Sequence, residues 1–568
     1  MLIYYDIMNF LNLHLLLTFP FIIFIMKKVL CHFFPRKNLV NGIKKLMELI
    51  TFIIQKKGLT KLFLIALSPI LWLVLALSVL KMPGHKACPL ALVAALAAAL
   101  FAENMSIVNA ATAVLEGVAL ACWPILLVII AAIFTYNLSL HTKGMETIKR
   151  MLTSVSTDRR VLILLIGWGF GGFLEGMAGF GTAVAIPASM LAGIGINPLL
   201  SAGVCLIANS VPTAYGSIGI PLVTLGNVTG IDPMELAKYT CLQLAPLTLL
   251  CPILMVIVTG KSLKALKGVG LLVIASGLGF LIPELFVAFF MGPELAVVAG
   301  SIGAMASIVL CAKLTKIDDP VYRLAGMEQI DTINVKQGII AWLPFILIFC
   351  LLLLTSKLIP AIHDPLNLVK TSVLIYTGSD ATPYTFTWLA TPGVLILLSA
   401  FIGGYVQKAS LGEMCSVLGT TIVNLRNTIL TIITVIATAK VMGYSGMTHQ
   451  IAETAVGATG TMYPFIAAFI GSIGTFITGS ATSSCVLFGK LQTDASLAIS
   501  APSAWVTAAN AAGACAGKMI SPQSIAIAVA AIGVAGCDSK LLKFAVKIYI
   551  PFVIAMGIIV YFGQMFIS

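Results

Sequence analysis

The chain has 568 residues, of which 59% are hydrophobic and only 10% are charged. So few charges cannot hydrate the surface of a soluble globular protein, and the composition therefore excludes that class and predicts an all-α polytopic protein embedded in the lipid bilayer. The net charge of +13 would favour nucleic acid as a partner of a soluble chain, but here the cations lie in loops, where they indicate topology, and we expect no nucleic-acid partner.

The N-terminal extension, residues 1–46, does not fit the charge pattern of the rest. Residues 10–26 read as a span or signal-like stretch, and nine cations follow between Lys27 and Lys61 against a single acid, Glu48. Crossing parity would put this basic region outside, against the positive-inside rule. We therefore favour a translation start at Met47, which would leave residues 1–46 outside the functional protein.

Apolar blocks fill the rest of the chain. We count about sixteen, some as long as the roughly twenty residues of a full span and some half that length. The longest polar stretches, 313–338 and 360–387, are too short to bury a core of their own, so no soluble domain is expected. We divide the transport domain into a first half, 47–330, and a second half, 331–568. The clearest spans are 62–80, 118–136, 240–258, 269–290, 295–312, 339–359, 388–406 and 544–567.

An internal duplication relates the two halves. Residues 173–191 return in altered form as 476–491, and each copy precedes a stretch that runs from an Asn to a Pro, at 208–221 and 509–522 with an offset of 301. Gly and Pro interrupt both copies at corresponding places, so we expect paired broken helices around a buried site, within repeats 161–225 and 462–536. The expected hinge and helix-break positions are Gly176, Gly179, Gly181, Asn209, Pro212, Pro221, Asn510, Gly517 and Pro522. For the two Asn residues we favour helix capping over substrate contact.

The basic loops indicate that the two copies are inverted. Five cations lie in 141–160, three in 260–268 and three in 537–547, so we place these loops inside; residues 102–117 carry only acids and face outside. Counting the membrane crossings between these loops predicts that the two repeats run through the bilayer in opposite directions. Non-helical backbone at mid-membrane depth survives where it lines a cavity, so we expect an inverted-repeat secondary transporter with paired re-entrant hairpins and roughly 12–14 spans.

Charged residues inside apolar blocks are expected to carry the mechanism, because an unpaired charge at mid-bilayer costs about 3 kcal/mol or more. Glu175 is either a proton-titrating carboxylate or a structural acid bonded to broken-helix amides. Lys518 replaces Ser217 of the first copy, and either binds a small carboxylate or snorkels to the interface. Arg426 is a rival anion clamp, and Lys440, nearer a helix end, is expected to snorkel.

A neutral polar cluster marks the second hairpin. Its hydroxyls could donate to a carboxylate at a re-entrant tip, where free amides of a helix N-terminus would add positive potential. Each hydroxyl could instead bond the preceding helical turn. The members are Thr478, Ser480, Thr482, Ser483 and Ser484.

Other chemistries find no support in the sequence. The twelve cysteines form no CxxC, and the six histidines are not spaced as metal or haem ligands, so no metal or cofactor is expected. A Walker A sequence, a nucleophile elbow and an HExxH pair are also absent. We therefore expect a transporter and not an enzyme.

Four segments resemble the most distinctive segments of the lactate permease family: 173–199, 206–221, 476–492 and 508–528. The resemblance extends from about Trp72 to the C-terminus and implies a proton-coupled symporter that imports lactate, and often glycolate, through the bacterial inner membrane. The family pattern favours Glu175, Thr478, Gly479, Ser480, Thr482, Ser483, Ser484, Lys518 and Ser521 as functional residues. The family's usual GSDTSSN differs here, because Ala481 and Cys485 replace the Asp and the Asn.

The predicted mechanism is electrostatic. Uphill entry of an anion against an inside-negative potential needs a co-transported cation, and a proton on Glu175 with the substrate carboxylate on Lys518 is the simplest arrangement. Two alternatives stay open, namely a sodium-coupled carrier of another small carboxylate and a transporter-derived membrane sensor or enzyme subunit. The sequence does not indicate an oligomeric state.

Overall fold

The computed structural model describes residues 61–567, apart from 81, 180, 316, 318, 325–333, 380 and 535–536. The chain divides into two compact units, Met1–Leu64 and Ile65–Ser568. Of the first unit, only the opening turn of helix α3 (Lys61–Val74) is described. The predictions made for residues 1–46 and for a start at Met47 lie outside the described residues. All the other described helices and strands belong to the second unit.

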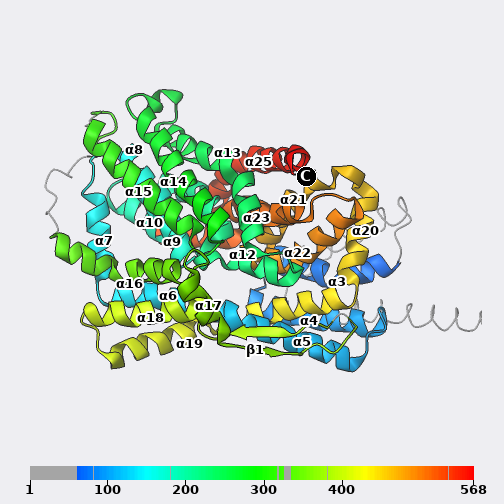
Figure 1. The fold of residues 1–568 in the computed structure, drawn as a ribbon. Coiled ribbons are helices and arrows are strands. Elements are labelled where there is room, and N and C mark those ends of the chain that lie inside the picture. Colours follow the sequence, from blue (N-terminus) through cyan, green and yellow to red (C-terminus); the bar gives the residue numbers. More distant parts are fainter. Residues whose placement is uncertain are drawn as a thin grey trace, which may run out of the picture. The chain divides into compact units, whose positions relative to one another are not determined.

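The first third of this unit is a succession of helices with frequent breaks (Figure 1). Three short π-helical segments interrupt it, at η1 (Leu75–Val79), η2 (Ala121–Leu126) and η3 (Ile163–Phe170), and a 3-10 turn lies at η4 (Pro212–Tyr215). The α-helices after α3 are α4 (Gly84–Phe101), α5 (Ile107–Leu120), α6 (Leu127–His141), α7 (Gly144–Thr153), α8 (Arg159–Leu162), α9 (Gly171–Met177), α10 (Thr182–Gly193), α11 (Pro198–Asn209), α12 (Gly216–Thr229) and α13 (Pro233–Gly260).

The middle of the chain holds three long helices, a short helix and a small β-hairpin. After the turn η5 (Leu263–Leu266) come α14 (Gly270–Phe290), α15 (Ala296–Thr315) and α16 (Val335–Leu354). Helix α17 (Pro360–Leu368) leads into an antiparallel hairpin of β1 (Lys370–Val373) and β2 (Tyr384–Thr387), in which Lys370 pairs with Thr387. The strands fall in a stretch that we expected to be polar.

The last part of the chain is again helical and repeats the pattern of breaks. It comprises α18 (Pro392–Val406), α19 (Leu411–Tyr444), α20 (Met447–Thr459), η6 (Gly460–Met462), α21 (Tyr463–Thr478), α22 (Ala481–Ala498), α23 (Ser503–Ile520), α24 (Pro522–Ile532), α25 (Asp538–Gly563) and η7 (Gln564–Phe566). Helix α19 packs against α4 and α5, and α6 packs against α18 (Figure 1).

Length and composition of the helices confirm the predicted all-α polytopic fold with broken helices. Ten helices among the described residues are long and apolar enough to span a membrane, or up to 12 if each of two bent helix pairs counts as one span. The upper figure meets the lower bound of the predicted range. The bent pairs are α11 with α12, at 61°, and α23 with α24, at 45°, so both predicted broken helices are present.

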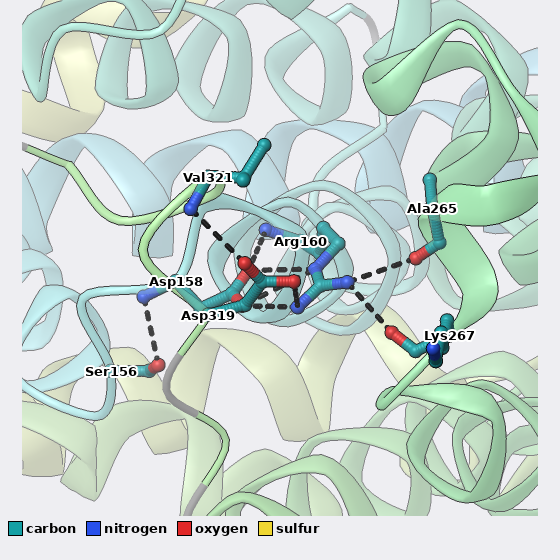
Figure 2. A network of polar contacts seen from close by, with 7 residues as sticks. All are labelled: Ser156, Asp158, Arg160, Ala265, Lys267, Asp319 and Val321. Atoms are coloured by element: carbon teal, nitrogen blue, oxygen red, sulfur yellow. Dashed lines mark hydrogen bonds and ion pairs between the residues drawn. The ribbon is translucent and has the colours of Figure 1, made fainter.

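A buried arginine joins two of the basic loops. Arg160 is 1% exposed; its guanidinium forms an ion pair with Asp158 at 2.7 Å and donates to the carbonyls of Ala265 and Lys267 at 3.0 Å (Figure 2). Asp319 approaches from the loop after α15, 3.7 Å from the same guanidinium. The loops at 141–160 and 260–268 therefore lie on the same face of the helix bundle, as the predicted topology requires.

Candidate functional site

The first hairpin consists of the segment η3–α9 and helix α10. Gly179 and Gly181 have φ of +60° and +89°, a conformation that costs glycine little, and they turn the chain back at the predicted hinge. Gly176 lies in α9, where a Cβ would come within 2.9 Å of Val298 on α15. The hairpin therefore depends on glycine for its turn and for its close packing.

The first broken helix runs from α11 to α12. Asn209 ends α11, and its amide donates to Thr213 Oγ1 at 3.3 Å across the break. Pro212 opens the turn η4, and after it Ser217 and Ile218 both have positive φ. Two consecutive non-glycine residues in the left-handed region cost of order 1–3 kcal/mol each. The break is therefore strained.

The second hairpin joins α21 to α22. Gly479, with φ +71°, ends α21, and Ser480 caps α22 by accepting from the N–H of Ser483 at 3.2 Å. Thr478 Oγ1 donates to Gly474 O at 2.8 Å, and Ser484 Oγ donates to Gly471 O at 2.7 Å. Among the described residues the hydroxyls of Thr482 and Ser483 have no hydrogen-bond partner. These two hydroxyls are free to meet a ligand.

The second broken helix runs from α23 to α24, and Pro522 is the first residue of α24. Ser521, at the break, is fully buried, and its Oγ has no hydrogen-bond partner among the described residues. Gly517 lies one turn earlier, where a Cβ would come within 2.1 Å of Ser472 O on α21. Gly513 and Gly471 are in equally close contact with Ala468 O and Asn510 O, so the backbones of α21 and α23 nearly touch.

Glu175 and Lys518 meet between the two copies. Glu175 of α9 is 4% exposed, and one of its oxygens, Oε2, has no hydrogen-bond partner among the described residues. Lys518 of α23 is 9% exposed, and the two side chains interact electrostatically without forming a direct ion pair. Asn209 is a further polar neighbour of the Glu175 carboxyl. A buried acid and a buried base thus share one site, which is closed to solvent in this conformation.

Lys518 is not snorkelling to the membrane surface. Its Nζ donates to the carbonyl of Gly479 at 2.8 Å, at the tip of the second hairpin. In the first copy Ser217 Oγ donates to the carbonyl of Ala178, also at 2.8 Å. Both donors and both acceptors are related by the offset of the duplication, so the same contact between broken helix and hairpin tip occurs twice, once neutral and once with a charge.

Three predicted roles need correction. Arg426 lies on an exposed face of α19 and makes no ion pair among the described residues, so the structure does not bring it to the site. Lys440 does not snorkel, because its Nζ is paired with Glu116 Oε1 at 2.7 Å. Asn510 is no helix cap, because it lies within α23, where its Oδ1 accepts from Gln492 and its amide donates to Ser484 O.

The sequence prediction also missed buried acids. Glu116 was assigned to an outer loop, but it lies in α5 and is 3% exposed. The sequence pattern could not reveal its burial, because its partner Lys440 is distant in sequence. Glu284 lies in α14, 1% exposed. It stands within an apolar run, so the rule that selected Glu175 could have found it. Among the described residues, no group of three or more His, Cys, Asp or Glu side chains could hold a metal ion.

Comparisons with known proteins agree on one family. The family model described as L-lactate permease matches residues 62–567. The L-lactate permease of Streptococcus iniae is 44% identical over 452 residues, which cover 80% of this chain and 94% of that protein. The glycolate permease GlcA of Escherichia coli K12 is 34% identical, with coverage of 88% and 95%. The L-lactate permease of the same strain is 35% identical, with coverage of 87% and 94%. Among solved structures, Neisseria gonorrhoeae MtrF aligns with a TM-score of 0.42 at 14% identity, covering 76% of this chain and 80% of that one.

Proposed function

Because the chain belongs to the L-lactate permease family, we propose that it imports L-lactate by proton symport across the bacterial inner membrane. Glycolate is a second candidate substrate, since a relative of nearly full-length coverage is named a glycolate permease. The observation that carries the proposal is the buried Glu175 beside the buried Lys518, one from each copy of the duplication.

In this proposal the ammonium of Lys518 holds the substrate carboxylate. One of its three donors is used by Gly479 O, which leaves two for the ligand. The unpartnered hydroxyls of Thr482 and Ser483 and the free amides at the start of α22 lie close in sequence to Gly479 and can complete the anion's hydrogen bonds. Ser521 contributes a buried, unpartnered hydroxyl at the break.

Glu175 binds the proton. Burial favours the neutral, protonated form of this carboxyl, whereas a nearby ammonium such as that of Lys518 favours release of the proton. With the proton on Glu175 and the anion on Lys518, the loaded site holds little net charge, which lowers the cost of moving it between the two faces of the bilayer.

Alternating access would result from the duplication. Six apolar helices, α13 to α16, α18 and α19, separate the two copies along the chain. An even number of crossings after a copy that itself crosses an odd number of times makes the second copy run in the opposite direction. The hairpins α9–α10 and α21–α22 would then enter from opposite faces, and the breaks of α11–α12 and α23–α24 would act as hinges.

The test is uptake of labelled L-lactate and glycolate by proteoliposomes that hold the purified protein. A pH gradient, acid outside, is expected to drive accumulation of lactate, and exchange of sodium for potassium at constant pH is expected to change nothing. Sodium-dependent uptake without a response to pH would show that sodium, and not a proton, is the co-transported cation. Absence of lactate counterflow would reject the transport proposal and favour a sensor or enzyme subunit.

A further inference from the structure

Glu284 is a second intramembrane carboxyl with no assigned task. It lies in α14 within the apolar run FLIPELF, residues 280–286, and is 1% exposed. Neither Oε1 nor Oε2 has a hydrogen bond of ordinary geometry among the described residues, although the thiol of Cys241, a weak donor, lies beside the carboxyl. Most buried polar groups in native proteins are bonded, so an acid without such a bond at either oxygen requires an explanation.

The surroundings of Glu284 provide no counter-charge. Its titratable neighbours are Cys241 on α13, Tyr215 in η4 and Cys515 on α23. The Tyr215 hydroxyl is already committed to Ala237 O at 2.6 Å, and the Cys515 thiol donates to Val211 O at 3.4 Å.

The charged residues on the helices packed against α14 lie elsewhere. Glu235 on α13 and Lys313 on α15 are exposed, and Lys238 is half-buried with its Nζ over the rings of Tyr239 and Phe289. The segment η3, which also contacts α14, has no ionisable side chain. An ionised carboxylate inside an apolar helix and without a counter-charge is costly, so we expect Glu284 to be protonated in this conformation.

Glu175 and Glu284 flank the same strained turn. Tyr215 and Cys515 face Glu284, and the next residue, Gly216, leaves room for Glu175, because a Cβ there would lie 2.6 Å from Glu175 Oε1. Cys515 interacts with both carboxyls.

The left-handed residues after the turn continue toward the end of α14. A Cβ on Gly219 would lie 2.8 Å from Pro293 O, just beyond that helix. A movement of the α11–α12 break would therefore change the surroundings of both Glu175 and Glu284.

We propose that Glu284 is a second proton-binding site, which is loaded and emptied in the same cycle as Glu175. The inference rests on the proposed function and deepens it. A carrier that moves two protons with one monocarboxylate anion moves one net positive charge. Uptake must then respond to the membrane potential alone, whereas a carrier with the Glu175 proton only would be electroneutral.

The experiment imposes an inside-negative potassium diffusion potential on proteoliposomes at equal pH on both sides, with valinomycin. Wild-type protein is expected to take up lactate several-fold faster with the potential than without it. Glu284→Gln is expected to lose this stimulation while a pH gradient still drives uptake at a reduced rate. Glu235→Gln, an exposed acid on α13, is the matched control and keeps the stimulation.

Two results would overturn the proposal: a wild-type protein whose uptake ignores the potential, or a folded Glu284→Gln protein that keeps the full stimulation. If Glu284→Gln does not fold, the wild-type proton-to-lactate ratio decides, because a ratio of one excludes a second transported proton. Wild-type protein without lactate counterflow would instead reject the proposed function itself, so the two failures are distinguishable.

Discussion

The backbone N–H of Ala214 donates a hydrogen bond to Cys515 Sγ at 3.2 Å, and the two residues are 301 positions apart, the offset of the duplication. Equivalent residues of two copies come into contact only close to the axis that relates the copies. Glu175 comes from one copy and Lys518 from the other, and both lie near this contact. The candidate site therefore depends on the duplication.

Glu175→Gln is expected to abolish accumulation of lactate driven by a pH gradient. The amide has nearly the shape of the carboxyl but cannot release a proton, so the substrate and proton movements are no longer coupled. Accumulation of labelled lactate in proteoliposomes is the measurement, and Glu146→Gln, at an exposed acid of α7, is the control. Unchanged proton-driven accumulation in the Glu175 variant would defeat the assignment.

Lys518→Ala is expected to raise the KM for lactate about tenfold or more, because a charge-assisted hydrogen bond contributes about 1.5–3 kcal/mol. Ser217→Ala removes the equivalent contact in the first copy, the bond to Ala178 O, without removing a charge. Its KM should change little. Initial uptake rates over a range of lactate concentrations decide, and equal increases in both variants would make Lys518 a structural residue only.

Lys440→Met is expected to destabilise the protein by about 3–5 kcal/mol, because it leaves the buried Glu116 carboxylate without a counter-charge, bonded only to the Tyr444 hydroxyl. The double variant Glu116→Gln/Lys440→Met should regain much of this loss, since no uncompensated charge remains. Thermal unfolding of the detergent-solubilised proteins measures both. A double variant no more stable than the single one would contradict this account.

Arg160→Ala is expected to cost a similar amount, about 3–5 kcal/mol, because the buried carboxylate of Asp158 loses its partner. The carbonyls of Ala265 and Lys267 also lose a donor, so the junction between the two basic loops loosens. Arg150→Ala, at an exposed position of α7, is the control. Melting temperatures that fall equally in both variants would argue against the network in Figure 2 as the cause.

Glu294, in the loop between α14 and α15, is expected to make stability depend on pH. Burial raises the pKa of Glu294 from 4.5 to about 7, Lys357 opposes the rise and Asp232 adds to it. A raised carboxyl pKa favours the protonated folded protein, so this contribution is present below pH 4.5 and is lost as the pH rises through about 7. Thermal melts at acid and alkaline pH should show a smaller difference for Glu294→Gln than for the wild type.

Local features of the site could be predicted from the sequence. Gly179, Gly181 and Pro522 mark turns and breaks through their own backbone preferences, so they could be placed at breaks without knowledge of any partner. The duplication also predicted which segments would come together. Both kinds of information are contained in single segments or in their repetition.

Pairings across the bundle could not be predicted in this way. Lys440 and Glu116 are far apart in sequence, and whether a helical lysine faces lipid or a carboxylate depends on how α5 and α19 pack. The same reason explains Asn510, whose bonds to Gln492 and Ser484 exist only once α22 lies against α23. Arg426 failed as a clamp because its side of α19 is exposed.

The near contact of α21 and α23 restricts how the second copy can move. Gly471, Gly513 and Gly517 leave no room for a side chain between the two backbones, so these helices cannot slide past one another without a clash. We expect the two helices to move as one rigid body, with any bending confined to the α23–α24 break at Ser521. Lys518 lies near the end of this helix pair, and its ammonium donates to Gly479 O. A ligand that draws the ammonium away would therefore also release the tip of the second hairpin.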